Sequence, residues 1–146
     1  MPAGDTLAKG NLKIGVDAAS AVSVADAVTE FALSFSRPTK SVKPTLATGE
    51  ESVRAGAPSF EIKITYYTDD VAAAGASNLL LGSLDTADGR MYFEGSLHEG
   101  VVSATNPKHS GFFYVTGAGL GGEVGEVAED SQTYPLTGRW MTSTTP

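Results

Sequence analysis

The stretch SFEIKITYYTDD, residues 59–70, decides the fold class, because it carries the clearest strand pattern in the chain. Apolar or aromatic side chains stand at every second position from Phe60 to Tyr66, and the alternate positions hold Glu61, Lys63, Thr65 and Tyr67. Alternation with a period of two over residues of high β propensity predicts a half-buried strand. Asp69 and Asp70 are expected to end it.

The rest of the chain extends this reading to the whole fold. At 146 residues the chain is expected to form one domain, and its 17 glycines favour a β protein rich in turns over a helical bundle. Further strands are expected at 11–17, 29–36, 91–94, 101–104, 112–116 and 131–136. A short helix is expected within 71–84, where three leucines form one apolar stripe. The prediction is a mainly β domain, a sandwich or barrel of about seven to eight strands flanked by one short helix.

Residues 38–58 interrupt this pattern. The segment contains proline and glycine breaks and few large apolar side chains. It is longer than the usual connection in a compact domain, and such long connections tend to be functional or disordered. A long loop and a protruding hairpin, with strands at 41–47 and 51–54, are equally compatible with the sequence.

Composition excludes several kinds of site. The chain has no cysteine and two histidines, which excludes disulfides, thiolate chemistry and a multi-histidine metal centre. Its formal charge of −7 opposes binding of nucleic acid, which depends on clustered basic residues. No apolar run is long enough to span a bilayer. Residues 1–10 lack the basic-then-apolar layout of a secretory signal, so export is not expected.

Candidate sites each have a simpler structural explanation. Asp69 and Asp70 suit a hard cation, but without a calcium-loop spacing they fit a strand end and helix cap better. The glycine-rich residues 117–126 lack the lysine of a phosphate loop and fit a β connection. His109 has no partners for a catalytic triad. We therefore expect no enzymatic activity, no metal and no cofactor.

The order of segments resembles a known family. FEIKITYYTDD, then ASNLLLGSL, then VSATNPKHSGFFYVTG and GEVGEVAEDSQTYPLTG are similar to the tail tube proteins (major tail proteins) of long-tailed bacteriophages. The resemblance covers residues 28–138. The chain is short for the family, so an extra outer domain is not expected.

This resemblance implies subunits that assemble into stacked, hexameric rings around a channel for phage DNA. It implies a place in the virion tail after synthesis in the host cytoplasm, with the tape measure, tail terminator and baseplate proteins as partners and no membrane contact. Segments that bridge successive rings would map to an N-terminal arm at 1–25, the segment 38–58, and a C-terminal arm at 139–146.

The resemblance also leads to a hypothesis about the acidic charge. An acidic channel would repel DNA, which carries a negative charge about every 1.7 Å of its axis, and would let it slide. The alternative is that the charges only keep the free subunit soluble. The candidate channel residues are Glu61, Glu94, Glu99, Glu123, Glu126 and Glu129.

Two other functions stay open from the sequence. One is a capsid decoration or head–tail connector protein, which would also assemble. The other is a carbohydrate-binding β-sandwich that uses Tyr66, Tyr67 or Trp140 as a stacking platform, because sugars pack on exposed aromatic rings.

Overall fold

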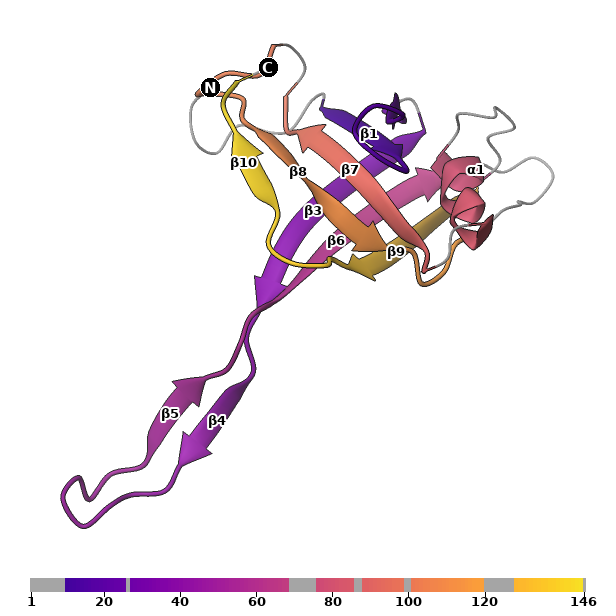
Figure 1. Ribbon diagram of the computed structural model, residues 1–146. Helices are drawn as coiled ribbons and strands as arrows, with labels where there is room; N and C mark the ends of the chain where they lie inside the picture. Colours follow the sequence, from indigo (N-terminus) through magenta and orange to yellow (C-terminus); the bar gives the residue numbers. More distant parts are fainter. Residues whose placement is uncertain are drawn as a thin grey trace.

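The computed structural model describes residues 10–25, 27–68, 76–85, 88–98, 101–119 and 128–145. Within them the chain forms two packed antiparallel sheets, a separate two-stranded hairpin and one short helix (Figure 1). The predicted mainly β sandwich with one flanking helix is therefore confirmed.

The larger sheet has the strand order β10-β8-β7-β1-β2. Its strands are β1 (Asn11–Gly15), β2 (Val22–Ser23), β7 (Arg90–Ser96), β8 (Lys108–Tyr114) and β10 (Met141–Ser143). β7 begins after a tight turn in which Gly89 adopts a φ of 74°, a value that favours glycine. β7 lies at the centre of the sheet, paired on one side with β1 and on the other with β8.

The smaller sheet has the order β3-β6-β9. Its strands are β3 (Val28–Ser36), β6 (Ser59–Tyr67) and β9 (Glu129–Pro135). The stretch that predicted the fold forms the central strand β6, which pairs along most of its length with both neighbours. A central strand needs a partner on each side and an apolar face, and the alternation in this stretch supplies that face.

The core lies between the two sheets. The larger sheet contributes mainly Ile14, Phe93 and Phe113, all fully buried. The smaller sheet contributes the apolar face of β6 and the Tyr134 side chain of β9. The rings of Phe113 and Tyr134 meet across the two sheets with centroids 5.4 Å apart.

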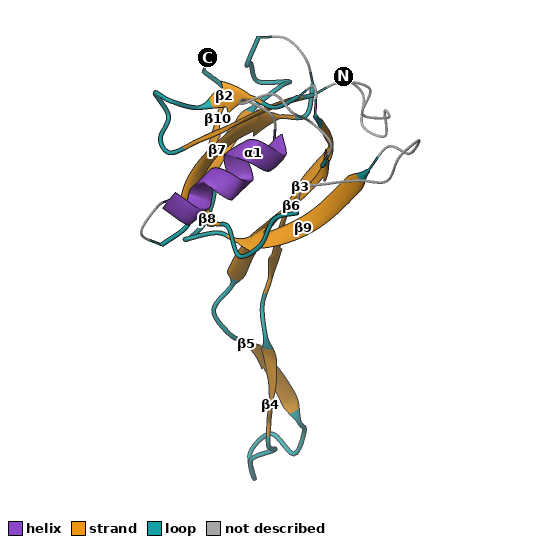
Figure 2. Cartoon of the chain, turned by 90° about the vertical axis from the view of Figure 1, so that its right-hand side faces the viewer, coloured by secondary structure: helices purple, strands orange, loops and turns teal. Residues whose placement is uncertain are grey.

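One short helix covers an open end of the sandwich. α1 (Ala76–Leu81) continues into the 3₁₀ turn η1 (Gly82–Asp85), and Leu80 enters the core with no exposed surface. α1 contacts β1 of the larger sheet and β6 of the smaller one, and Figure 2 shows it alongside the two layers.

The segment that interrupts the strand pattern is a hairpin. β4 (Thr39–Val42) and β5 (Ser52–Ala55) pair with each other and form a sheet of their own. They extend the β3–β6 pair well beyond the sandwich, as a thin projection (Figures 1 and 2). We call residues 37–58 the hairpin arm.

The structure corrects part of the predicted strand list. Residues 101–104 are not a strand; Ser103 makes only an isolated bridge to Asn106. β8 starts at Lys108, between the strands expected at 101–104 and 112–116, and pairs with β7 and β10. The described residues hold ten strands rather than seven to eight, because β2 and β10 are too short to show alternation and the arm contributes two.

Parts of the two terminal segments expected as arms belong to the larger sheet, and residues 1–9 and 146 lie outside the described residues. In the N-terminal segment 1–25, β1 lies inside the larger sheet and buries Leu12 and Ile14. In the C-terminal segment 139–146, β10 pairs with β8, and Trp140 packs against the core. Apolar side chains in both segments find partners in the sandwich, so these parts do not project from it.

Candidate assembly surfaces

The outer face of the smaller sheet is polar. Strand alternation directs Glu61, Lys63 and Thr65 of β6 away from the core, because Ile62 and Ile64 point into it. Their neighbours across the strands are small or polar, such as Ser34 and Thr133. A wide face of hydroxyl and carboxylate groups offers no apolar patch for a folded partner.

The candidate channel residues do not all lie on this face. Glu61 and Glu129 are exposed there, whereas Glu94 lies on the outer face of the larger sheet, on the opposite side of the core. Glu99, Glu123 and Glu126 lie outside the described residues. One face of the subunit therefore presents Glu61 and Glu129 together but not Glu94.

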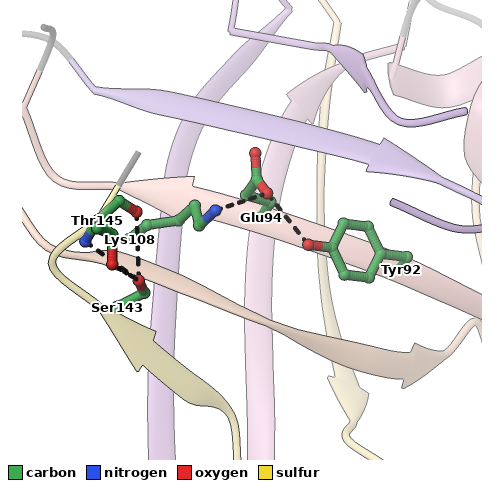
Figure 3. Close-up of polar contacts among 5 residues, drawn as sticks. All are labelled: Tyr92, Glu94, Lys108, Ser143 and Thr145. Carbon is green, nitrogen blue, oxygen red and sulfur yellow. Dashed lines mark hydrogen bonds and ion pairs between the residues drawn. The ribbon is translucent and has the colours of Figure 1, made fainter. Parts of the chain in front are cut away.

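The larger sheet has a different outer face, with aromatic and charged side chains in contact. The Tyr92 and Phe112 rings meet with centroids 5.4 Å apart, and the Arg90 guanidinium lies 4.3 Å from the Phe112 centroid. Tyr92 donates a hydrogen bond to Glu94 at 3.1 Å, and Lys108 Nζ lies 3.4 Å from Glu94 Oε1 (Figure 3). Burial raises the pKa of the Tyr92 hydroxyl, with the Glu94 charge adding to the effect.

This aromatic face was not recognised as a surface from the sequence, although alternation placed Tyr92 and Glu94 opposite the core side of β7. The adjacent Phe112 and Phe113 could have revealed it, because neighbouring residues on a strand point to opposite faces. Phe113 is fully buried, so Phe112 is directed outward.

The hairpin arm is the most exposed part of the described chain. All its side chains are exposed except that of Val42, which is half-buried. At its tip, the hydroxyl groups of Thr45 and Thr48 each accept a hydrogen bond from the other residue's backbone N–H. Gly49 follows with a φ of 60°. The tip is thus a defined turn, and Leu46 projects fully from it.

Strand edges are a second feature suited to assembly. Among the described residues, β3 and β9 are the two edges of the smaller sheet, and β3 is nine residues long with a strand partner on one side only. Phe35, near its end, is 59% exposed. Open edges carry unpaired backbone donors and acceptors that can pair with another chain.

The aromatic residues considered for sugar binding do not form a shared platform. Tyr66 is fully buried; its hydroxyl donates to Asp130 Oδ2 at 3.1 Å and accepts from the Gly119 N–H at 3.0 Å. Trp140 packs edge-on against Phe60, with centroids 5.6 Å apart. Tyr66 is therefore closed to a sugar ring, whereas Tyr67 is half-buried on the outer face of β6.

The other candidate sites show no catalytic arrangement among the described residues. The His109 imidazole Nδ1 lies 3.0 Å from the Thr142 hydroxyl, and burial lowers the pKa of the ring. No group of three or more acidic or histidine side chains in the described ranges could hold a metal. Asp69, Asp70 and most of the glycine-rich segment 117–126 lie outside those ranges.

None of the helices in this part of the chain has the length and apolar character needed to cross a membrane.

Comparisons with known proteins show a shared fold but no family. No family model and no curated protein matches the sequence. Among solved structures, a chain of the "Virion of native gene transfer agent (GTA) particle" matches with a TM-score of 0.58 and 15% sequence identity. The alignment covers 90% of this chain and 95% of that one. The two chains are therefore similar in fold over nearly their full lengths.

Proposed function

We propose that this chain is a structural virion protein, a tail tube subunit whose copies form stacked rings around a channel for DNA. The observation that carries the proposal is the fold shared, end to end, with a chain of a gene transfer agent virion. Open edges on the smaller sheet and an arm that leaves the sandwich support it, because head-to-tail contacts through such features close into rings or extend into filaments. The proposed role involves neither enzymatic activity nor a cofactor.

In this assembly the part of the outer face of the smaller sheet around Glu61 lines the channel. The small hydroxyl side chains and exposed carboxylates such as Glu61 on this face neither attract phosphate groups nor offer an apolar surface. Lys63, the basic residue of β6, is held near Glu30, with 3.5 Å between its Nζ and the carboxylate. The aromatic face of the larger sheet then faces away from the channel.

Electron microscopy of the purified full-length protein tests the assembly. Hollow tubes of uniform width at high protein concentration are expected. Isolated rings that never stack would instead favour a capsid decoration or head–tail connector protein. Monomers at every concentration and salt tested by sedimentation would overturn the proposal.

The channel face is tested by charge reversal in a phage or particle that uses this subunit. Glu61→Lys is expected to leave tube formation intact but slow the release of DNA, because a ring of added cations binds phosphates. Asp85→Lys, an equal change at an exposed position on η1, is the control and should release DNA at the wild-type rate. Unchanged release from Glu61→Lys tubes would remove this face from the channel.

A further inference from the structure

The hairpin arm places two basic side chains directly opposite each other. Lys40 of β4 and Arg54 of β5 are paired in register, so both project from the same face of the hairpin. Like charges in this position destabilise a strand pair. The arm has no core to offset the repulsion, and an isolated two-stranded hairpin is marginally stable in water. An anion between the two side chains would convert this repulsion into attraction.

The arm also differs in charge from the rest of the chain. Residues 37–58 contain four basic and two acidic side chains, a formal charge of +2. The remaining residues contain six basic and fifteen acidic side chains, a formal charge of −9. A second copy of this chain is therefore an anionic partner for the arm, present at whatever concentration the subunit itself reaches.

Exposed carboxylates stand at the end of the sandwich opposite the arm. β3 and β6 run from this end to the arm: Val28 pairs with Tyr66 at one end, and Ser36 with Ser59 at the other. Glu30 and Glu129 are exposed on the outer face near the first of these ends, and Lys63 Nζ lies 3.5 Å from the Glu30 carboxylate; we call the two glutamates the acidic pole. Thr29 donates a 2.9 Å hydrogen bond to Glu129, which orients that carboxylate.

We propose, on the basis of the assembly proposed above, that the Lys40 and Arg54 face of the hairpin arm binds the acidic pole of the next copy, head to tail. Arg54 contributes the forked donors that suit a carboxylate, and Lys40 a point charge beside it. The opposite face of the arm, with Ser41 and Val53, is not part of this contact. The two ends of the subunit are thus complementary in charge, which makes the stacking directional.

The basic face is tested with two double variants that change the net charge equally. Lys40→Gln with Arg54→Gln removes the basic pair, and Thr39→Glu with Ser41→Glu adds two negative charges on the opposite face. The first variant is expected to raise the protein concentration needed for tube formation by about tenfold or more, since charge-assisted contacts are lost. The second is expected to assemble nearly as the wild type does.

Thermal unfolding of the unassembled subunit separates this role from a structural one. Removing the Lys40–Arg54 repulsion should leave the melting temperature unchanged or slightly raised while assembly falls. A drop in both would indicate that the pair stabilises the hairpin itself and would overturn the inference. Assembly of the wild type should also weaken with added NaCl, more steeply than assembly of the Lys40→Gln, Arg54→Gln variant.

A charge swap tests the partner surface. Lys40→Glu with Arg54→Glu, and separately Glu30→Lys with Glu129→Lys, should each fail to form tubes, whereas the chain carrying all four changes should form them again. Normal assembly of the Lys40→Gln, Arg54→Gln variant would overturn this inference and leave the proposed function standing. If the Thr39→Glu, Ser41→Glu variant lost assembly as the Lys40→Gln, Arg54→Gln variant does, the claim that only the Lys40 and Arg54 face makes the contact would be overturned. A wild type that never assembles would overturn both proposals.

Discussion

At the scale of single residues, the interior of the sandwich holds a polar network around two tyrosines. Tyr134, fully buried, donates a 2.6 Å hydrogen bond to the Gly117 carbonyl, and Tyr66 holds the N–H of Gly119. Gln132 donates to Asp130 Oδ2 at 2.7 Å, the same oxygen that Tyr66 contacts. The network therefore fixes the backbone that follows β8 against β6 and β9.

Burial raises the pKa of Tyr134, so the folded protein keeps this hydroxyl protonated above its ordinary pKa of 10.0. Tyr134→Phe leaves the Gly117 carbonyl without this donor and should lower the free energy of unfolding by about 1–3 kcal/mol at pH 7. The stability that Tyr134 contributes is complete below pH 10 and declines as the pH rises above it, because only the unfolded state ionises readily. The difference in the free energy of unfolding between the wild type and Tyr134→Phe, measured by urea titration, should therefore be smaller at pH 11 than at pH 7.

Tyr67→Phe is the matched control for that measurement. Tyr67 is next in the chain but lies on the outer face of β6, where a substitution is expected to change the free energy of unfolding by no more than about 0.5 kcal/mol. A constant gap across the pH range would show that Tyr134 does not titrate differently in the folded and unfolded states.

A second residue-scale constraint is the close approach of backbones at Gly15. A Cβ at this position would lie 2.6 Å from the Ala21 Cα and 2.8 Å from its nitrogen. Gly15→Ala should therefore lower the free energy of unfolding by about 1–3 kcal/mol, since backbone has to shift. At Gly82 an added Cβ meets nothing within 4 Å, so Gly82→Ala should be neutral or slightly stabilising. Urea unfolding measures the free energy of unfolding of both variants. Equal values for Gly15→Ala and Gly82→Ala would contradict the steric argument.

At the scale of elements, the hairpin arm is separable from the sandwich. Its side chains are exposed, and the strands on either side are already paired at Ser36 and Ser59, whose hydroxyls lie 3.2 Å apart. We therefore expect the arm to add little to the stability of the domain, and in the proposed assembly its length serves contacts outside the subunit.

Replacing residues 37–58 with Asn-Gly, which favours a two-residue hairpin turn, should leave a folded sandwich. Its free energy of unfolding is expected to stay within about 0.5 kcal/mol of the wild type, because no core side chain is lost. Fluorescence of Trp140, the chain's single tryptophan, reports unfolding. Tube formation should be lost in the same preparation. A variant that unfolds would show that the arm supports the sandwich.

At the scale of the whole molecule, the two ends of the subunit differ in charge: a basic arm leaves one end, and exposed carboxylates lie at the other. A directional contact predicts that a copy without its arm still accepts an arm from a neighbour but offers none. Mixing the arm-deleted chain with wild type should shorten tubes progressively as its fraction rises, measured as mean length in electron micrographs.

The Glu30→Lys, Glu129→Lys chain is the complementary dopant. It keeps its arm but cannot receive one, so it should shorten tubes as well. A chain with both defects should stay out of the tubes and leave their length unchanged. Shortening by that doubly defective chain would indicate that association runs through other surfaces, such as the β3 edge.

The sequence by itself determined the mainly β class and the position of the central strand, because side-chain alternation is local and needs no knowledge of the partner strand. Proline and glycine in the same way marked residues 38–58 as an interruption, without choosing between a loop and a hairpin. Two adjacent aromatic residues on β8 also carried the information that one of them faces outward.

Only the tertiary structure decided which strands pair and which sheet each outward residue belongs to. Glu61 and Glu94 both alternate with core residues, yet they lie on opposite faces of the sandwich. Residues 101–104 suit a strand locally, but β8 instead satisfies its backbone groups with β7 and β10. The opposition of Lys40 and Arg54 is likewise a matter of register. Pairing depends on apolar surface buried between segments far apart in the chain, and no local pattern encodes that.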